Sequence, residues 1–137
     1  MELKKIIFAQ HTQKDIGLLW FRVLASLSIM KAHGIPKIMA FSETVEHIAD
    51  PLGLGGTFSA FFAVFANVIC AGLVAIGLAT RWAALTIMTL TLNGLLLIHF
   101  RDSAAIQDVP LIYTIVFGFI SFVGAGKYSL DHKLFNN

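Results

Sequence analysis

Long apolar runs separated by short polar segments dominate the chain. Four of them are long enough to cross the hydrocarbon core of a bilayer, which takes about 20 residues of helix. We predict membrane-spanning helices at about residues 16–35, 58–79, 82–100 and 109–123. Only Thr80 and Arg81 separate the second run from the third, so these two helices are expected to form a tight antiparallel pair.

Proline and acidic residues suggest where the first and last spans end and begin. Pro36 disfavours helix in the residue before it, so the first span is expected to end near Ile35. Asp108 is expected to cap the start of the last span, with Pro110 in its first turn, where a missing N–H is tolerated.

The segment between the first two spans has its own helical period. Its apolar positions are Ile38, Phe41, Val45, Ile48 and Ala49, and its polar positions are Ser42, Glu43, Glu46 and His47. This pattern predicts a short amphipathic helix that lies on the outer interface or caps the bundle. The predicted fold is an all-α four-helix transmembrane bundle with this interfacial helix between helices one and two. It forms a single integral membrane domain over residues 1–137.

Composition agrees with a membrane protein and excludes several functions. Of 137 residues, 57% are apolar and 13% are charged, whereas a soluble domain has about 25% charged residues. The net charge of +2 is too small to indicate nucleic acid. The lone Cys70 cannot form an internal disulfide or a redox pair. The segment from Met1 to Asp15 has no small-residue cleavage site, so the first span is expected to remain as an anchor.

The Lys and Arg residues of the short loops predict the orientation. One side carries Lys4, Lys5, Lys14, Arg81, Lys127 and Lys133, and the other carries Lys37 and Arg101. Because basic loops stay inside, we expect a multi-pass protein of the inner (cytoplasmic) membrane with both termini in the cytoplasm.

Polar residues within the first span form one stripe at 100° per residue: Asp15, Arg22, Ser26, His33 and Lys37. Charges inside a span usually face the bundle interior or a cavity, although a snorkelling arginine would explain the pattern without a site. A buried Arg22 needs a partner. Asp15, two turns below it, or an acidic group or ligand on another helix would serve.

Two histidines are expected in the same leaflet, because the first and third spans both end on the outer side. His33 and His99 could flank one outward-facing pocket together with Lys37. Histidine can bind metal, move protons or donate to a quinone carbonyl. Two histidines without a third ligand do not indicate a metal site. The simpler interpretation is two unrelated interfacial histidines.

Asn67 lies near the middle of the second span. Amides at this depth often join membrane helices by hydrogen bonds, so a packing role competes with a ligand-binding role. The candidate ligand-binding residues are Arg22, His33, Lys37, Asn67 and His99, and no catalytic residue or metal ligand is predicted.

Several short motifs occur in a set order along the chain. They are Arg22 followed by Lys31-Ala32-His33-Gly34-Ile35-Pro36-Lys37, then Asp50-Pro51-Leu52-Gly53-Leu54-Gly55, Ile76-Gly77-Leu78-Ala79-Thr80-Arg81-Trp82-Ala83-Ala84, His99, and Gly124-Ala125-Gly126-Lys127-Tyr128-Ser129-Leu130-Asp131. In their order and spacing they resemble the DoxX-like family of small four-helix membrane proteins. Many members carry a glutamate where this chain has Asn67, so any proton-transfer role of that glutamate is not implied here.

The resemblance implies a link to sulfur and thiol redox, since one member is a subunit of a thiosulfate–quinone oxidoreductase. It implies no established catalytic residue. The first hypothesis is therefore a redox-linked membrane subunit that binds a quinone between its helices and serves a membrane or soluble redox partner protein. The second is a non-enzymatic scaffold or assembly subunit. The third is a small-solute transporter or channel, for which four spans would require a homo-oligomer.

Overall fold

The structure is a computed structural model that describes residues 14–135. The expectations for Lys4, Lys5 and most of the segment from Met1 to Asp15 lie outside this range. Within it, four helices are long and apolar enough to cross a membrane: Lys14–Met39, Gly56–Ile76, Thr80–Ile98 and Ala104–Val123. The predicted all-α architecture with four spans is confirmed.

Three of the four spans change from α-helical to π-helical hydrogen bonding within their length. The first span consists of α2 (Lys14–Ile29), η1 (Met30–Gly34) and α3 (Ile35–Met39). The second consists of α5 (Gly56–Val64), η2 (Phe65–Cys70) and α6 (Ala71–Ile76). The third consists of α7 (Thr80–Asn93) and η3 (Gly94–Ile98), whereas α8 (Ala104–Val123) is a continuous α-helix. The wider π turns bond each N–H to the carbonyl five residues earlier.

Two predicted helix ends were wrong because proline is accommodated inside a helix. Pro36 lies in the first turn of α3, directly after η1, so the first span continues to Met39. There the missing proline N–H needs no partner in the preceding π turn. The last span begins at Ala104, after Ser103, and places Pro110 in its interior. Asp108 therefore does not cap this helix.

A short helix between the first two spans was predicted, and α4 (Phe41–His47) confirms it. Its inner side rests on the start of α5. A Cβ atom on Gly56 would lie 2.4 Å from the carbonyl oxygen of Val45, so only glycine allows this approach. The rings of Phe41 and Phe61 pack with centroids 4.9 Å apart. The helix therefore covers the end of the second span.

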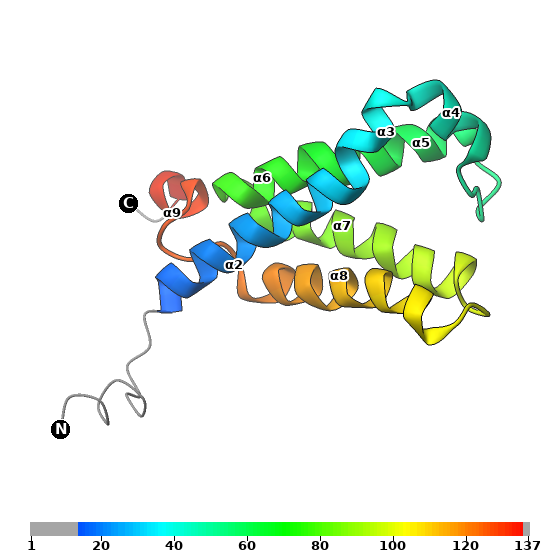
Figure 1. Cartoon of the computed structure of the whole chain (residues 1–137). Helices are drawn as coiled ribbons and strands as arrows, with labels where there is room; N and C mark the ends of the chain where they lie inside the picture. Colours follow the sequence, from blue (N-terminus) through cyan, green and yellow to red (C-terminus); the bar gives the residue numbers. More distant parts are fainter. Residues whose placement is uncertain (1–13, 136–137) are drawn as a thin grey trace.

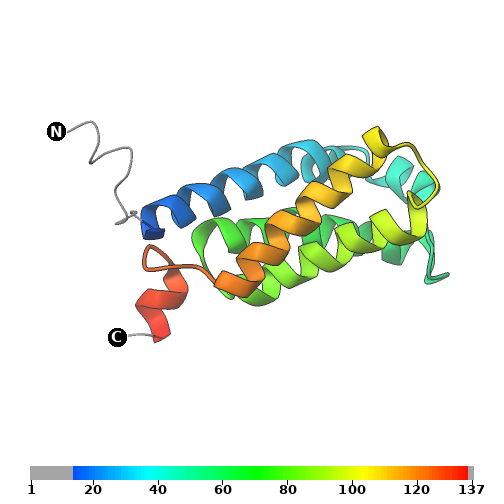
Figure 2. The same cartoon turned by 90° about the horizontal axis from the view of Figure 1, so that it is seen from below.

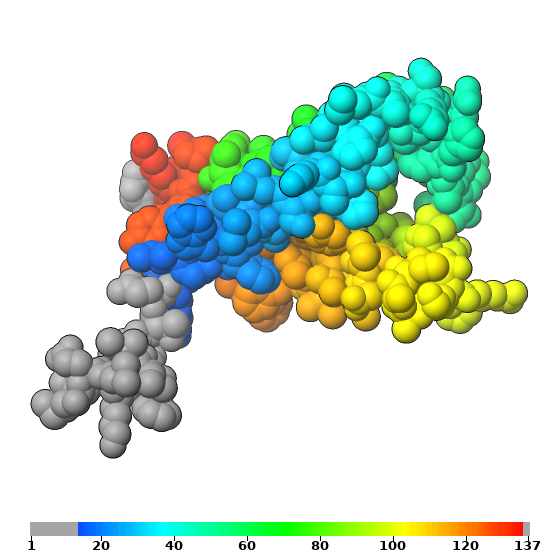
Figure 3. Space-filling model, in the orientation of Figure 1, coloured from blue at the N-terminus to red at the C-terminus, as the bar shows by residue number. Residues whose placement is uncertain are grey.

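The spans form two antiparallel helical hairpins. We call the end that holds the start of α2, the α6–α7 turn and α9 (Leu130–Phe135) the termini end, and the opposite end the loop end. The hairpins lie close together toward the termini end and diverge toward the loop end (Figure 1). Seen from below, α8 runs obliquely across the bundle (Figure 2). Figure 3 shows the surface hollowed at the loop end, between the segment after α4 and the α7–α8 connection.

The packed core explains why the hairpins stay together in their termini half. Small residues let the helices approach closely, as is common in membrane bundles. Ala66, Ala71 and Ala84 are fully buried there, and Phe117 and Ile87 fill the space between the hairpins. Cys70 belongs to this core as a buried free thiol.

Candidate functional site

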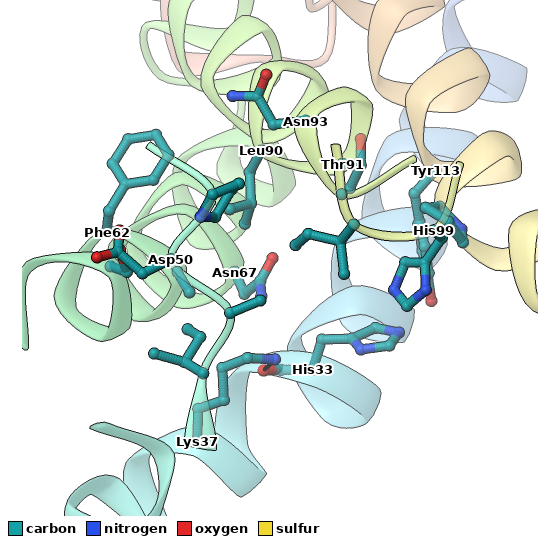
Figure 4. Close-up of a pocket in the computed structure, with 18 of the residues that line it drawn as sticks. His33, Lys37, Asp50, Phe62, Asn67, Leu90, Thr91, Asn93, His99 and Tyr113 are labelled. Atoms are coloured by element: carbon teal, nitrogen blue, oxygen red, sulfur yellow. Dashed lines mark hydrogen bonds between the residues drawn. The ribbon is translucent and has the colours of Figure 1, made fainter. Parts of the chain in front are cut away.

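The diverging hairpins enclose a cavity of about 690 Å³ at the loop end. Residues from all four spans and from the loop after α4 line it. Most of the lining is apolar, with Ile29, Phe58, Phe62, Leu90, Ile98 and Val109 among its members. The polar lining side chains include His33, Lys37, Asn67, Asn93, His99 and Tyr113, which are labelled in Figure 4.

The first hairpin supplies one wall of the cavity, with Asn67 at its centre. Asn67 lies in η2 and is only 4% exposed. Its carbonyl oxygen Oδ1 is buried and has no hydrogen-bond partner among the described residues. An unsatisfied buried acceptor costs about 1–3 kcal/mol. Asn67 therefore does not join two helices by hydrogen bonds, as the packing interpretation of an amide requires.

A close crossing of the two π segments holds this wall in place. Gly34, the last residue of η1, is buried against η2. A Cβ atom at Gly34 would lie 2.8 Å from the backbone oxygen of Asn67 and 2.7 Å from Cγ2 of Val68. One turn later, Lys37 donates to the backbone oxygen of His33 over 2.8 Å. The π turns thus bring the imidazole, the ammonium and the amide to one cavity.

The second hairpin supplies the opposite wall, with His99 directly after η3. The imidazole Nδ1 of His99 lies 2.7 Å from Oδ2 of Asp102. Tyr113 of α8 contributes its ring, which meets the ring of His33 edge-on at 5.5 Å between centroids. The Tyr113 hydroxyl shares a 2.8 Å hydrogen bond with Ser28. In Figure 4, His33, His99 and Tyr113 lie toward one side of the cavity.

A tight loop that starts at Asp50 forms part of the rim. The Asp50 carboxylate accepts hydrogen bonds from the N–H groups of Leu54 and Gly55, over 3.0 and 2.8 Å, and from the Ser59 hydroxyl over 3.0 Å. Gly53 and Gly55 both have positive φ, which glycine adopts without strain. The hydrogen bond from Gly55, followed by those from Leu54 and Ser59, lowers the pKa of Asp50 despite the opposing effect of desolvation.

Arg22 does not line this cavity. It is 1% exposed and lies near the termini end, where its guanidinium donates to the backbone oxygen of Val74 over 2.8 Å and to those of Ala75 and Tyr128. Val74 and Ala75 are in the last turn of α6, where the Val74 carbonyl also accepts from the backbone N–H of Gly77 over 3.2 Å. Arg22 thus ties three segments together, and its Nε is the nitrogen left without a partner.

Asp131 completes this arrangement, which we call the termini-end clasp: Arg22, Gly77, Ala79, Tyr128 and Asp131. The backbone N–H of Asp131 donates to the backbone oxygen of Gly77 over 2.8 Å. The Asp131 carboxylate accepts from the N–H groups of Ala79 and Thr80 over 2.7 and 3.0 Å, at the start of α7. Partial burial alone would raise its pKa. These hydrogen bonds and the charge of Arg22 outweigh burial and bring the pKa of Asp131 below its ordinary value.

The structure therefore brings four of the five candidate residues together and places the fifth elsewhere. His33, Lys37, Asn67 and His99 line one cavity, and Arg22 belongs to the clasp. Asp15, considered as a partner for Arg22, instead accepts from the backbone N–H of Lys127 over 3.1 Å. No group of three or more metal-ligating side chains occurs within residues 14–135.

Sequence reasoning did not single out Asp50, Asn93 or Tyr113 as cavity residues, nor Asp102 beside His99. Tyr113 lies in an apolar run, although a tyrosine inside a span needs a partner for its hydroxyl. Asp102 lies only three residues from His99. Asp50 was named only as part of a motif, although its carboxylate organises the turn that it begins. The spacing of the Asp102 and His99 pair was the one readable signal.

The arrangement suits an apolar molecule with polar oxygens at its head. The apolar lining would bury a ring or chain, Lys37 can donate, and Asn67 can both donate and accept.

Comparison with known proteins supplies the family. Neither the curated proteins nor the solved structures contain a significant match to the chain. The DoxX family model matches residues 17–100, which hold every cavity residue of the first three spans. The chain is thus a multi-pass membrane protein that belongs to the DoxX family.

Proposed function

We propose that this protein is a redox-linked membrane subunit that binds a quinone-type molecule in the loop-end cavity. A partner protein would carry out the other half of the electron transfer. The observation that carries the proposal is the amide of Asn67, which is 4% exposed, lines a mostly apolar cavity and has no partner for its Oδ1.

The buried amide of Asn67 costs free energy as long as its oxygen has no hydrogen-bond partner. Leucine would fill nearly the same space as Asn67 without leaving a buried acceptor unsatisfied. Keeping the amide is favourable if a bound molecule supplies the missing hydrogen bond. A buried, unpartnered amide that faces a cavity is therefore what a site for a polar head group requires.

The shape of the cavity supports a lipid-soluble ligand. The cavity lies where the two hairpins diverge, within the depth that the four spans cross. Its apolar lining would hold the isoprenoid or alkyl chain of such a molecule. Bound quinone would supply reversible two-electron chemistry to the site.

Each proposed binding residue has a distinct role. Lys37 and His33 would donate to, or neutralise charge on, one oxygen of the head group. Asn67 would hydrogen-bond the head group from the same wall of the cavity as Lys37 and His33, and His99 would contact it from the opposite wall. Arg22 would contribute indirectly, because the clasp keeps the hairpins together at the far end of the bundle.

A channel receives less support than a closed site. Below the cavity, the space between the hairpins is filled by Phe117, Ile87 and Val74, each of which is 0% exposed. One copy of the chain therefore has an apolar plug where a pore for solutes would need polar lining. The scaffold hypothesis remains the alternative, since it requires no ligand.

We also propose that the loop end faces outward and both termini face the cytoplasm. The Lys and Arg residues of residues 14–135 support this, because Lys14, Arg81, Lys127 and Lys133 flank the termini end. Fusing a reporter that is active only in the cytoplasm to the C-terminus should give signal. A reporter active only outside would give signal if the orientation were reversed.

Mass spectrometry of organic extracts tests the ligand. The protein would be purified in mild detergent beside Asn67→Leu, Ser26→Ala and a mock membrane preparation. Ser26 is the matched control, because its hydroxyl is also buried and unpartnered but does not line the cavity. We expect a quinone at near-stoichiometric level in the native protein and in Ser26→Ala, and its loss in Asn67→Leu. A folded native protein without enriched quinone would favour the scaffold.

A further inference from the structure

The wall formed by the second hairpin carries a group that distinguishes a hydroxyl from a carbonyl. We infer that His99, set by Asp102, makes the cavity prefer the reduced, dihydroxy form of a quinone-type ligand over the oxidised, dicarbonyl form. This inference rests on the proposed function, since it concerns the ligand of the same cavity. It assigns His99 to recognition of one hydroxyl and Asp102 to positioning His99.

The contact between the two side chains fixes where the imidazole proton lies. A carboxylate can only accept hydrogen bonds, and Oδ2 of Asp102 lies 2.7 Å from Nδ1 of His99. Nδ1 must therefore carry a proton. In the neutral ring the other nitrogen, Nε2, then has a free lone pair and is an acceptor. His99 lines the cavity, where Nε2 would accept from a ligand.

The backbone around the pair is held in a compact turn. The Asp102 N–H donates to the backbone oxygen of His99 over 3.0 Å. The Gln107 amide donates to the backbone oxygens of His99, Phe100 and Asp102 over 3.0, 3.1 and 3.1 Å. One side chain of α8 therefore satisfies the end of the third span and fixes both members of the pair. Orienting partners of this kind determine which tautomer an imidazole adopts.

The other polar groups of the cavity are compatible with a preference for the dihydroxy form of the ligand. Asn67, which lines the opposite wall, has a second unpartnered acceptor, Oδ1, and that atom is itself buried. Lys37 is a donor, and it has further N–H groups beyond the one given to His33. The Tyr113 hydroxyl is already engaged by Ser28. A hydroxyl can donate to an acceptor and still accept from Lys37, whereas a carbonyl oxygen would face the lone pair of His99 without a proton between them.

Asp102→Asn provides a test that reverses the chemistry while keeping the size of the side chain. The amide N–H of asparagine would donate to Nδ1, so the imidazole proton would move to Nε2. Nε2 would then donate and would favour a carbonyl. Asp108→Asn is the matched control, since it removes the same charge from the same end of the molecule at an exposed residue that does not line the cavity.

The experiment compares two dissociation constants for each variant. A short-chain alkyl benzoquinone and its hydroquinone, kept reduced without oxygen, would be titrated by calorimetry into protein in lipid nanodiscs. We expect the wild type and Asp108→Asn to bind the hydroquinone about tenfold more tightly, a difference of about 1.4 kcal/mol. In Asp102→Asn the ratio should fall to one or reverse.

The outcomes separate this inference from the proposed function. Binding of both forms with equal affinity in the wild type would overturn the preference and leave the quinone site standing, as would a ratio left unchanged in both Asp102→Asn and His99→Phe. Binding of neither form would overturn the proposed function itself. If Asp102→Asn folds poorly, His99→Phe gives the same test, because it removes the acceptor and should bring the ratio close to one.

Discussion

The two ends of this bundle bury polar side chains in opposite ways. At the termini end, Arg22 and Asp131 spend their hydrogen bonds on backbone groups that helix ends would otherwise leave bare. At the loop end, Asn67 lines a cavity, and its buried Oδ1 has no partner among the described residues. Both patterns read alike in the sequence, as polar residues inside apolar runs. The difference shows that a candidate binding residue needs both an unpartnered polar group and a place in a cavity, since Ser26 and Thr80 are also buried and unpartnered but do not line the cavity.

The comparison also explains the shape of the bundle. The clasp and the alanine-rich core hold the hairpins together at one end, and the π turns and the loop around Asp50 shape the other. Substitutions in the clasp are thus expected to lower mainly the stability of the fold, and substitutions in the cavity mainly ligand binding.

The largest expected effect comes from Arg22. Arg22→Met removes the donors to Val74, Ala75 and Tyr128 while keeping much of the side-chain volume. Because charged hydrogen bonds are lost and buried carbonyls remain, we expect destabilisation of about 3–5 kcal/mol. Thermal unfolding in detergent should show it as a large fall in the midpoint. The unfolding midpoint of Arg22→Lys should lie between those of the wild type and Arg22→Met, because one ammonium cannot reach all three acceptors. Wild-type stability in Arg22→Met would refute the clasp.

A smaller effect is expected at Gly34. In Gly34→Ala the new methyl group would lie 2.8 Å from the backbone oxygen of Asn67, so η1 and η2 must separate. We expect about 1–3 kcal/mol of destabilisation together with weaker quinone binding. Gly72→Ala is the control, because its Cβ would meet only Cε of Met30 at an ordinary 3.9 Å. Equal effects of the two changes would mean that the crossing does not position Asn67.

Asp131 should give a smaller, pH-dependent effect. Its pKa is lowered in the folded protein, so its stabilisation is complete above its unfolded pKa of about 3.9 and is lost as pH falls through the folded value. Asp131→Asn should cost about 1 kcal/mol at pH 7, as the loss of a helix cap does. The unfolding midpoints of variant and wild type should converge on acidification. A gap that persists at a pH below the folded-state pKa of Asp131 would assign the loss to something other than the carboxylate.

The smallest effect, of opposite sign, is expected for the ligand-free protein at Asn67. Asn67→Leu removes an acceptor that has no partner, so the unfolding midpoint should stay the same or rise by the equivalent of about 1 kcal/mol. Measuring it after delipidation, beside Ser26→Ala, isolates this effect from ligand loss. A clear fall would show that the amide supports helix packing after all.

Most of the fold could be predicted, because a bilayer imposes helices of a known length and apolarity. The helix ends were the weak point. The sequence contains Pro36 and Pro110, but whether a proline stops a helix depends on the hydrogen bonds around it, as η1 and the interior of α8 show. Local rules for proline cannot foresee a π turn.

The site was predictable only in part. The stripe from Arg22 to Lys37 was predicted for a regular α-helix. A shared helix face does not show which neighbouring segment each residue on it contacts. Arg22 meets the last turn of α6, whereas Lys37 reaches the cavity. The convergence of His33 and His99 followed from the odd numbering of their spans. Their position relative to Asn67 required the tertiary packing of η1 on η2.

The three π segments have a consequence for how such a chain changes by insertion and deletion. A π turn holds one more residue than the α turn it replaces, so each of η1, η2 and η3 is equivalent to a single inserted residue. Deleting Val68, for example, should restore an α-helix and leave the flanking segments close to their present orientation, whereas a deletion within an ordinary α-helical stretch would turn one side by about 100° relative to the other. Related chains aligned with this one would then show one-residue gaps at these places, where gaps inside a membrane helix are otherwise unexpected.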